Sequence, residues 1–249
     1  MIVLKSNEEI ELMAAAAEVT AHMLEELPSV IVPGMSTKDI DRWCEEYILR
    51  HDMKPAFKGY GGFPATACVS VNEEVVHGIP SKKKILREGD IVSVDLGTIY
   101  KGFYSDAART YPVGKISETD EKLIRVAEES FFEGLKFCRK GNRLGDVSHA
   151  IQECVEGYGF SVIRDFVGHG VGRNLHEDPQ IPNYGKANRG PQLVPGMVLA
   201  IEPMIAVGEY DVEVLSNEWT AVTIDRSNAA HYENTVVITD GEPRLLTKL

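Results

Sequence analysis

The feature of this 249-residue chain that most constrains its fold is an order of elements that occurs twice. Two segments with helical periodicity, 6–27 and 36–50, precede one group of β-branched runs, and two more, 117–141 and 145–159, precede a second group. The pattern predicts two similar halves, each with helices before strands. The β-branched runs are TACVSV (66–71), DIVSVD (90–95), MVLAIE (197–202), TAVTID (220–225) and NTVVIT (234–239).

A short match between the two halves supports this repeat. EGDIVSVDLG (88–97) and PGMVLAIEPM (195–204) each run from a glycine through a β-rich stretch to a carboxylate six positions after that glycine. We interpret the match as an internal pseudo-repeat. No linker rich in Pro, Gly or Ser separates the halves, at about 1–115 and 116–249, so we expect one merged domain over 1–249.

Start and stop signals bound the helical segments. Ser6 and Ser36 each precede an acidic residue by three positions, which is the spacing of a capping box at a helix start. Pro28 is expected to follow the end of the first helix, because proline cannot continue the hydrogen-bond pattern. Gly141 is expected to cap the third helix at its carboxyl end.

Composition and charge exclude several classes of protein. Hydrophobic residues make up 43% of the chain, but no apolar run reaches the roughly 18 residues of a membrane span. The net charge of −12 argues against a direct nucleic-acid site, which needs a basic face. The four cysteines form no CxxC pair, so we expect reduced thiols and a cytoplasmic protein.

Asp95 and Asp106 are predicted to lie on one hairpin, with two glycines between them. A turn centred on Tyr100 and Lys101 would make the two aspartates directly opposed, with Cβ atoms about 5 Å apart. Two carboxylates at that distance repel by roughly 3 kcal/mol at an effective dielectric constant of 20. A shared proton, a lysine or arginine between them, or a metal ion would relieve the repulsion.

Other side chains favour the metal ion. His169 lies between two glycines, and His176 follows seven residues later. Glu202 ends a strongly apolar run and Glu233 begins another, positions where a carboxylate is costly unless it is paired or binds a cation. Oxygen-rich sites with an imidazole suit Mn, Fe, Co or Zn. Four carboxylates exceed what one divalent ion needs, which indicates two ions.

At this point the sequence resembles a known family, the type I methionine aminopeptidases, over nearly the whole chain. The resemblance implies an α+β pita-bread fold, in which two pseudo-symmetric α/β halves with antiparallel sheet surround a dinuclear metal site, and hence a single catalytic domain. The motifs that carry the resemblance are VNEEVVHGIP (71–80), VDLG (94–97) with GFYSDAART (102–110), GHGVGRNLHEDPQIPN (168–183), IEPM (201–204) and YENTVVIT (232–239).

The resemblance implies a hydrolase that removes the initiator methionine from nascent polypeptides whose second residue is small. Two divalent ions, from among Co, Mn, Fe, Zn and Ni, would hold a water that attacks the peptide carbonyl. Asp106 and Glu233 would bridge the ions, Asp95 would hold one of them, and His169 with Glu202 would hold the other.

The resemblance also assigns the remaining site residues. Glu202 would be the general base, His77 would contact the scissile amide as an acid or hydrogen-bond donor, and His176 would stabilise the oxyanion. The methionine pocket would be lined by Phe57, Tyr60, Phe63, Cys68, Leu175 and Trp219.

The sequence departs from the family next to its last glutamate, where Asn234 replaces the histidine of many members. A histidine occurs at 231 instead, and we interpret it as a polar residue on a strand face in preference to a ligand. Neither position is a ligand in the family, so the departure concerns only the groups around the metal site.

The expected partners are nascent polypeptide N-termini, with no membrane and a monomeric enzyme. The basic run 81–84 is interpreted as a solvated loop, with a transient ribosome contact as the alternative. Two other functions remain open from the residues. One is a proline-specific aminopeptidase or dipeptidase with the same five ligands, and the other is a metal-free peptide-binding protein on the same fold.

Overall fold

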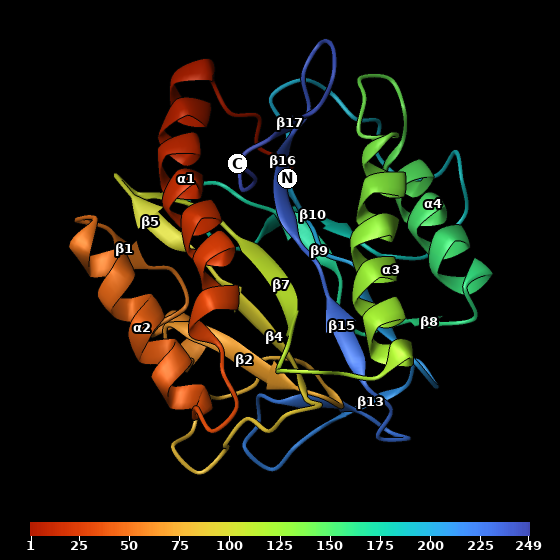
Figure 1. The fold of residues 1–249 in the computed structure, drawn as a ribbon. Coiled ribbons are helices and arrows are strands. Elements are labelled where there is room, and N and C mark those ends of the chain that lie inside the picture. Colours follow the sequence, from red (N-terminus) through yellow and green to blue (C-terminus); the bar gives the residue numbers. More distant parts are fainter.

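The computed structural model describes residues 1–249, with two pairs of helices flanking the strands (Figure 1). The helices are α1 Asn7–Val30, α2 Thr37–Arg50, α3 Glu118–Leu135 and α4 Leu144–Gly157, with a 3-10 turn η1 at Tyr60–Gly62. The strands are β1 Lys54–Pro55, β2 Ala67–Val71, β3 Glu74–Val76, β4 Ile91–Leu96, β5 Thr98–Tyr100, β6 Phe103–Tyr104, β7 Ala107–Pro112, β8 Ser161–Val162, β9 Gly168–Gly170, β10 Glu177–Ile181, β11 Val198–Ile201, β12 Met204–Ala206, β13 Val212–Val214, β14 Ala221–Thr223, β15 Ala229–His231, β16 Asn234–Val237 and β17 Arg244–Leu245.

All strand pairs are antiparallel, and each of the five predicted β-branched runs contains a strand. Two sheets are central. In one, β4 lies between β2 and β7, and in the other, β11 lies between β9 and β16. The two central strands are those of the ten-residue match, so equivalent segments of the two halves occupy equivalent places in their sheets. No helix combines the length and apolar character needed to cross a membrane.

The predicted helix starts are confirmed. Ser6 and Ser36 are N-caps, and both form capping boxes with the acidic residue three positions later. The predicted end of the first helix is wrong, because Pro28 lies inside α1. A proline cannot donate to the carbonyl four residues earlier, and here the Leu24 carbonyl accepts a hydrogen bond of 2.7 Å from the Tyr111 hydroxyl instead.

The predicted cap of the third helix is also wrong. α3 ends at Leu135. Its last turn is closed by hydrogen bonds that span three residues, from the Phe137 N–H to the Gly134 carbonyl and from the Cys138 N–H to the Leu135 carbonyl. Gly141 instead has a φ of +95° in the connection to α4, and its N–H donates to the Leu193 carbonyl at 3.0 Å.

Side-chain alternation on β4 determines which residues face the other half of the molecule. Val92, Val94 and Leu96 are buried in the core cluster that contains residues of α1 and α2. Because successive side chains on a strand point to opposite faces, Ser93 and Asp95 lie on the other face. The hydrophobic pattern that attaches the sheet to its helices therefore also turns Asp95 away from them.

The same alternation operates on β11. Leu199 and Ile201 are buried in the core cluster that contains residues of α3 and α4, so Ala200 and the following Glu202 belong to the opposite face. Hydrogen bonds join the two sheets close to this point, from the Glu233 N–H to the Ala108 carbonyl at 2.9 Å and from the Thr235 hydroxyl to the Asp106 carbonyl at 2.8 Å. The β7 and β16 segments therefore join the two sheets beside the residues that face away from the helices.

The predicted register of the Asp95 hairpin is wrong by two residues. Asp95 is opposite Ala108, and the turn consists of Lys101 and Gly102, which have φ values of +47° and +83°. Two consecutive positive φ values are typical of the type I′ turn of a two-residue hairpin. Asp106 is therefore the diagonal neighbour of Asp95 on the same face, a distance that carboxylate side chains can still bridge.

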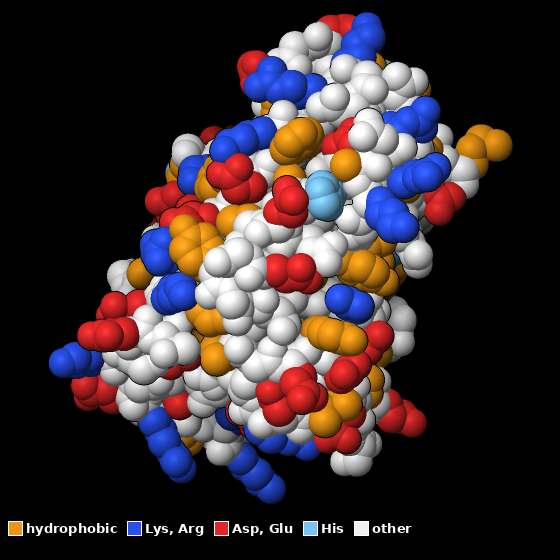
Figure 2. Space-filling view, turned by 90° about the vertical axis from the view of Figure 1, so that its right-hand side faces the viewer, with side chains coloured by type: hydrophobic (Ala, Val, Ile, Leu, Met, Phe, Trp, Pro, Cys, Tyr) orange, Lys and Arg blue, Asp and Glu red, His pale blue; other side chains and the backbone are white.

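The outer face formed by α3 and α4 is mixed in charge. Figure 2 shows acidic, basic and apolar side chains interspersed over this side of the molecule. Many of the charges are paired along a helix, such as Arg125 with Glu129 at 2.7 Å and Lys136 with Glu133 at 2.6 Å.

Candidate metal centre and substrate cavity

One cavity of about 230 Å³ lies where the two sheets meet. Five of its lining residues are the predicted ligands, and they reach it from both halves. β4 supplies one aspartate and the residue before β7 another, while β9, the residue after β11 and the residue before β16 supply the rest. The five are Asp95, Asp106, His169, Glu202 and Glu233.

His169 is held so that its outer nitrogen faces carboxylates. Its Nδ1 is 2.9 Å from the Gly170 carbonyl, and its Nε2 lies 3.5 Å from Asp106 Oδ2 and 3.6 Å from Glu202 Oε1. A Cβ added at Gly168 would lie 2.4 Å from the Ala200 carbonyl oxygen, so only glycine allows β9 to approach β11 this closely. The neighbouring glycines thus determine where the imidazole sits.

Burial shifts the pKa values of the carboxyls upward. It raises the pKa of Asp95 to about 7, with the neighbouring Glu202 adding to the rise and the nearby His231 opposing it. Burial first, and then the adjacent carboxylates, raise the pKa values of Asp106 and Glu233 well above their ordinary range. Burial alone does so for Glu202. Burial thus disfavours the charged form of all four carboxyls, and neighbouring carboxylates add to this effect for Asp95, Asp106 and Glu233.

The site fits a bound cation. Asp95 Oδ1, Asp106 Oδ1 and Glu233 Oε1 are buried without any hydrogen-bond partner. No lysine or arginine forms an ion pair with the four carboxylates, whose ion-pair contacts are all with histidines. The nearby Arg109 is engaged elsewhere, by the carbonyls of Ala108 and Glu233 and by the Asn234 side chain. Unpartnered carboxylate oxygens with an imidazole are a donor set for divalent ions.

The two predicted catalytic histidines lie on the same cavity. His176 Nδ1 is 2.9 Å from the Tyr60 hydroxyl, and its ring lies 4.2 Å, centroid to centroid, from that of His169. His77 has a φ of +58°, a strained conformation for a non-glycine residue, and its ring meets the edge of Phe166. Burial lowers the pKa of His77 to about 4 and also lowers that of His176, so both rings are neutral near pH 7.

The rest of the cavity wall is apolar and aromatic. All six predicted pocket residues line it, with Cys68 in the strand beside Asp95 and Phe63 in edge-to-face contact with Trp219. Burial raises the pKa of the Cys68 thiol well above its usual range, so this cysteine contributes as an apolar group. Sequence reasoning missed five lining residues, although each lies within or close to a recognised motif or a predicted pocket residue, and this proximity was the available signal. They are Gly61, Val76, Phe166, Val167 and Met204.

The two residues that depart from the family pattern are both buried. Asn234 Oδ1 accepts from Arg109 at 2.7 Å and from the Thr247 hydroxyl at 3.0 Å. His231 ends β15, and its Nε2 lies 3.5 Å from Glu202 Oε2. Its side chain is therefore not simply a polar group on a strand face, because it points toward the carboxylates.

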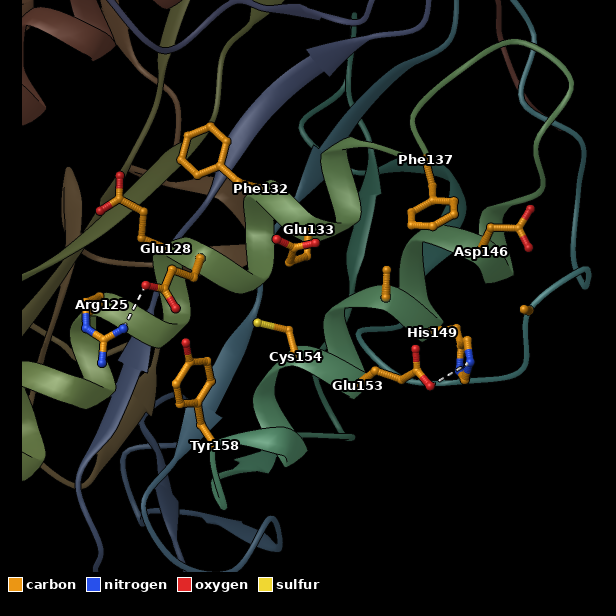
Figure 3. A pocket seen from close by; sticks show the side chains of 13 residues that line it. Arg125, Glu128, Phe132, Glu133, Phe137, Asp146, His149, Glu153, Cys154 and Tyr158 are labelled. Atoms are coloured by element: carbon orange, nitrogen blue, oxygen red, sulfur yellow. Dashed lines mark hydrogen bonds and ion pairs between the residues drawn. The ribbon is translucent and has the colours of Figure 1, made fainter.

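A second hollow lies between α3 and α4, away from the carboxylates (Figure 3). Acidic side chains line it beside Phe137 and Tyr158, which are 40% and 39% exposed, and Arg125 pairs with Glu129 within it. Its charges are solvated or paired along a helix, and it holds no buried unpartnered oxygen. The cavity between the sheets is therefore the candidate site.

Comparison with known proteins agrees with this geometry. Residues 11–240 match metallopeptidase family M24. The chain belongs to this family. Membership in a metallopeptidase family means that the clustered carboxylates belong to an enzyme that uses divalent metal ions.

The M24 chain is also similar to named relatives over its full length. It is 56% identical over 247 residues to a methionine aminopeptidase of Clostridium acetobutylicum, an alignment that covers 99% of both chains. The structure of a methionine aminopeptidase from Thermotoga maritima superimposes with a TM-score of 0.98 at 53% identity and covers 100% of both chains. A prolidase from Pyrococcus furiosus has a TM-score of 0.81 at 25% identity, over 99% of this chain and 66% of that one.

These comparisons confirm the expected α+β pita-bread fold. They also confirm the expected enzyme class, a metal-dependent aminopeptidase.

Proposed function

We propose that this M24 enzyme removes the N-terminal methionine from nascent polypeptides in the cytoplasm. The observation that carries the proposal is a single cavity with two chemically different walls. One wall has four carboxylates and His169, and the other is built of aromatic and apolar side chains. A thioether side chain fits the second wall, because sulfur–aromatic contacts are favourable.

The five clustered residues would hold two divalent ions, with Asp106 and Glu233 shared between them. Ions bound there lower the pKa of water, which makes hydroxide available near neutral pH, and polarise a carbonyl group. The unpartnered oxygens of Asp95, Asp106 and Glu233 support this assignment. The identity of the ions follows from the donor set only as far as Mn, Fe, Co, Zn or Ni.

Glu202 acts as the general base, which takes a proton from the attacking water and passes it to the leaving amine. Its side chain is only 13% exposed and lies between the imidazoles of His169 and His231. His176 donates a hydrogen bond to the developing oxyanion, a contribution of about 3 kcal/mol for a well-placed donor. The hydrogen bond between its Nδ1 and Tyr60 supports this role, because it fixes the ring.

His77 contacts the scissile amide from the opposite side. Its neutral ring can offer one N–H, and its strained backbone holds it against Phe166. The methionine side chain lies against the apolar wall, and the free amine of the substrate lies near the carboxylates. We also propose a preference for a small second residue, which the resemblance to the family implies. The apolar wall comprises Phe57, Tyr60, Phe63, Cys68, Leu175 and Trp219.

The test compares two peptides, Met-Ala-Ser and Ala-Pro-Ser, with the protein in Mn²⁺ and after chelation. We expect release of methionine from the first peptide in Mn²⁺, no release after chelation, and little cleavage of the second. His169→Ala should abolish the release. Preferential cleavage of Ala-Pro-Ser would favour a proline-specific aminopeptidase instead. Absence of any cleavage with Mn²⁺, Fe²⁺ or Co²⁺ would favour a binding protein.

A further inference from the structure

His231 is the buried ionisable residue beside the site that the proposed mechanism does not use. Its side chain is 1% exposed, and its Nε2 has no hydrogen-bond partner. Two carboxylate oxygens lie near it, Glu202 Oε2 at 3.5 Å and Glu233 Oε2 at 3.9 Å. A buried nitrogen without a hydrogen-bond partner costs about 1–3 kcal/mol of folding free energy. The position of His231 Nε2 beside two carboxylates therefore needs an explanation.

The backbone of His231 is fixed on both sides. Its N–H donates to the Thr110 hydroxyl oxygen at 2.8 Å, and that hydroxyl lies 2.9 Å from the His231 carbonyl oxygen. The same hydroxyl lies 2.8 Å from the Ser93 hydroxyl on β4, and His231 is opposite Met204 of β12. Strands from both halves thus hold the backbone of His231 in place, and its side chain is buried.

Glu202 has one imidazole on each of its carboxylate oxygens. His169 lies 3.6 Å from Oε1, and His231 lies 3.5 Å from Oε2. No other hydrogen-bond donor reaches this carboxylate, because Asn183 bonds to the Glu202 backbone carbonyl and not to its side chain. His231 is therefore the residue that can determine how the carboxylate of Glu202 is turned.

His231 does not line the cavity, whereas Glu202 does. The ring thus reaches Glu202 from behind the cavity wall. Its ligand atom lies within 4.8 Å of oxygens of Glu202 and Glu233, so the test must distinguish a positioning residue from a metal ligand. We propose that His231 is a positioning residue, which donates a hydrogen bond from Nε2 to Glu202 Oε2 and so keeps Oε1 toward the cavity. This inference rests on the proposed role of Glu202 as ligand and base.

The gap between Nε2 and Oε2 exceeds a normal hydrogen bond by only about 0.5 Å, which a small rotation of the glutamate side chain closes. Groups that orient a metal ligand in this way are worth about 10- to 100-fold in metal affinity or activity. The amide nitrogen of a glutamine occupies nearly the same place as Nε2 of a histidine. An asparagine, one methylene shorter, cannot reach it.

The test therefore compares His231→Gln with His231→Asn, two polar substitutions that differ in reach. We expect His231→Asn to lower kcat for Met-Ala-Ser about 10- to 100-fold with KM nearly unchanged, and to weaken Mn²⁺ binding to a similar degree. His231→Gln should retain most of both. The number of Mn²⁺ ions per chain, measured by calorimetric titration, should be the same in all forms. His22→Asn, on the exposed face of α1, is the surface control and should change nothing.

Three results would overturn the proposal. One is a His231→Asn enzyme with wild-type kcat and Mn²⁺ affinity. A second is the loss of one bound ion per chain, which would make His231 a ligand. The third is an equal loss of kcat and Mn²⁺ affinity in both variants, together with an equal loss of thermal stability, which would make the role of His231 purely structural. The titrations decide these points without reference to catalysis. A wild-type protein that bound Mn²⁺ but released no methionine would reject only the proposed function.

Discussion

At the scale of single residues, the buried carboxylates of the site affect the stability of the metal-free protein. Asp106 has a buried oxygen with no partner, and its pKa is raised by burial and by Asp95. Removing the charge should therefore help the metal-free fold while it harms metal binding. A residue that is unfavourable for the empty protein and favourable for the loaded one is typical of a functional site.

Asp106→Asn keeps the shape of the side chain and removes its charge. We expect the free energy of unfolding of the metal-free protein near pH 8 to rise by about 1–3 kcal/mol, the usual cost of a buried unsatisfied polar group. Mn²⁺ affinity should fall by more than about 100-fold, because even indirect partners of a ligand are worth 10- to 100-fold. Urea unfolding and calorimetric titration measure the two effects. Asp211→Asn, at an exposed aspartate, should alter neither, and a metal-free Asp106→Asn protein less stable than wild type would contradict the account.

The same carboxyls predict how metal-free stability depends on pH. Their folded-state pKa values lie above the unfolded ones, about 7 against 3.8 for Asp95, so their contribution is present at low pH and is lost as pH rises through the folded value. The buried histidines act in the opposite direction, because burial lowers the pKa of His77 to about 4, and their contribution is lost as pH falls below 6.5. Above pH 6.5 the contribution of the histidines is complete, so the raised pKa values of the carboxyls set the direction of the change.

The melting temperature of the chelated protein should therefore fall between about pH 6.5 and 8.5. Saturating Mn²⁺ should remove this decline, because bound cations favour the ionised carboxylates. Differential scanning calorimetry at several pH values, with and without the ion, measures both curves. A chelated protein whose stability rises over this range would show that the carboxylates are neutralised by something other than bound metal.

At the scale of elements, the position of His169 depends on how closely β9 approaches β11. Gly168→Ala would place a Cβ 2.4 Å from the Ala200 carbonyl oxygen. We expect a loss of about 1–3 kcal/mol in the free energy of unfolding, together with weaker Mn²⁺ binding, since the strand that carries the ligand must shift. Gly157→Ala at the end of α4, where the added Cβ meets nothing within 4 Å, is the matched control and should be neutral or stabilising by up to about 1 kcal/mol. Equal effects of the two substitutions would contradict this interpretation.

Sequence patterns predicted the elements better than their ends and registers. The serine caps and the β-branched runs are local signals, and they were sufficient to locate α1, α2 and the two central strands. The continuation of α1 past Pro28 is accompanied by a tertiary hydrogen bond from the Tyr111 hydroxyl to the Leu24 carbonyl, which no local pattern reveals. The hairpin register depended on Lys101 adopting a positive φ, which a lysine does without any sequence signal.

The candidate site was predictable where ionisable residues interrupt apolar runs. Glu202 and Glu233 stand out for this reason, and alternation along the strands then turns Asp95 inward. His231 was not predictable in the same way, because its neighbours in the chain resemble any half-buried strand. Its position beside Glu202 results from the pairing of β15 with β12, which is a long-range contact.

At the scale of the whole molecule, the carboxylates of the candidate site come from both halves of the chain. We propose that residues 1–249 act as one catalytic domain whose halves, about 1–115 and 116–249, each bring two carboxylates to the shared cavity. Asp95 and Asp106 come from the first half, and Glu202 and Glu233 come from the second. A site divided in this way should be lost as a unit, since each half alone keeps only one of the two proposed bridging carboxylates.

The most direct test of this account is a calorimetric titration of the chelated protein with Mn²⁺, followed in parallel by methionine release from Met-Ala-Ser. The account predicts two ions per chain, with activity that is absent at the start and rises with metal occupancy. Full activity in the chelated protein, or a chain that binds no ion while its four carboxylates remain in place, would contradict it.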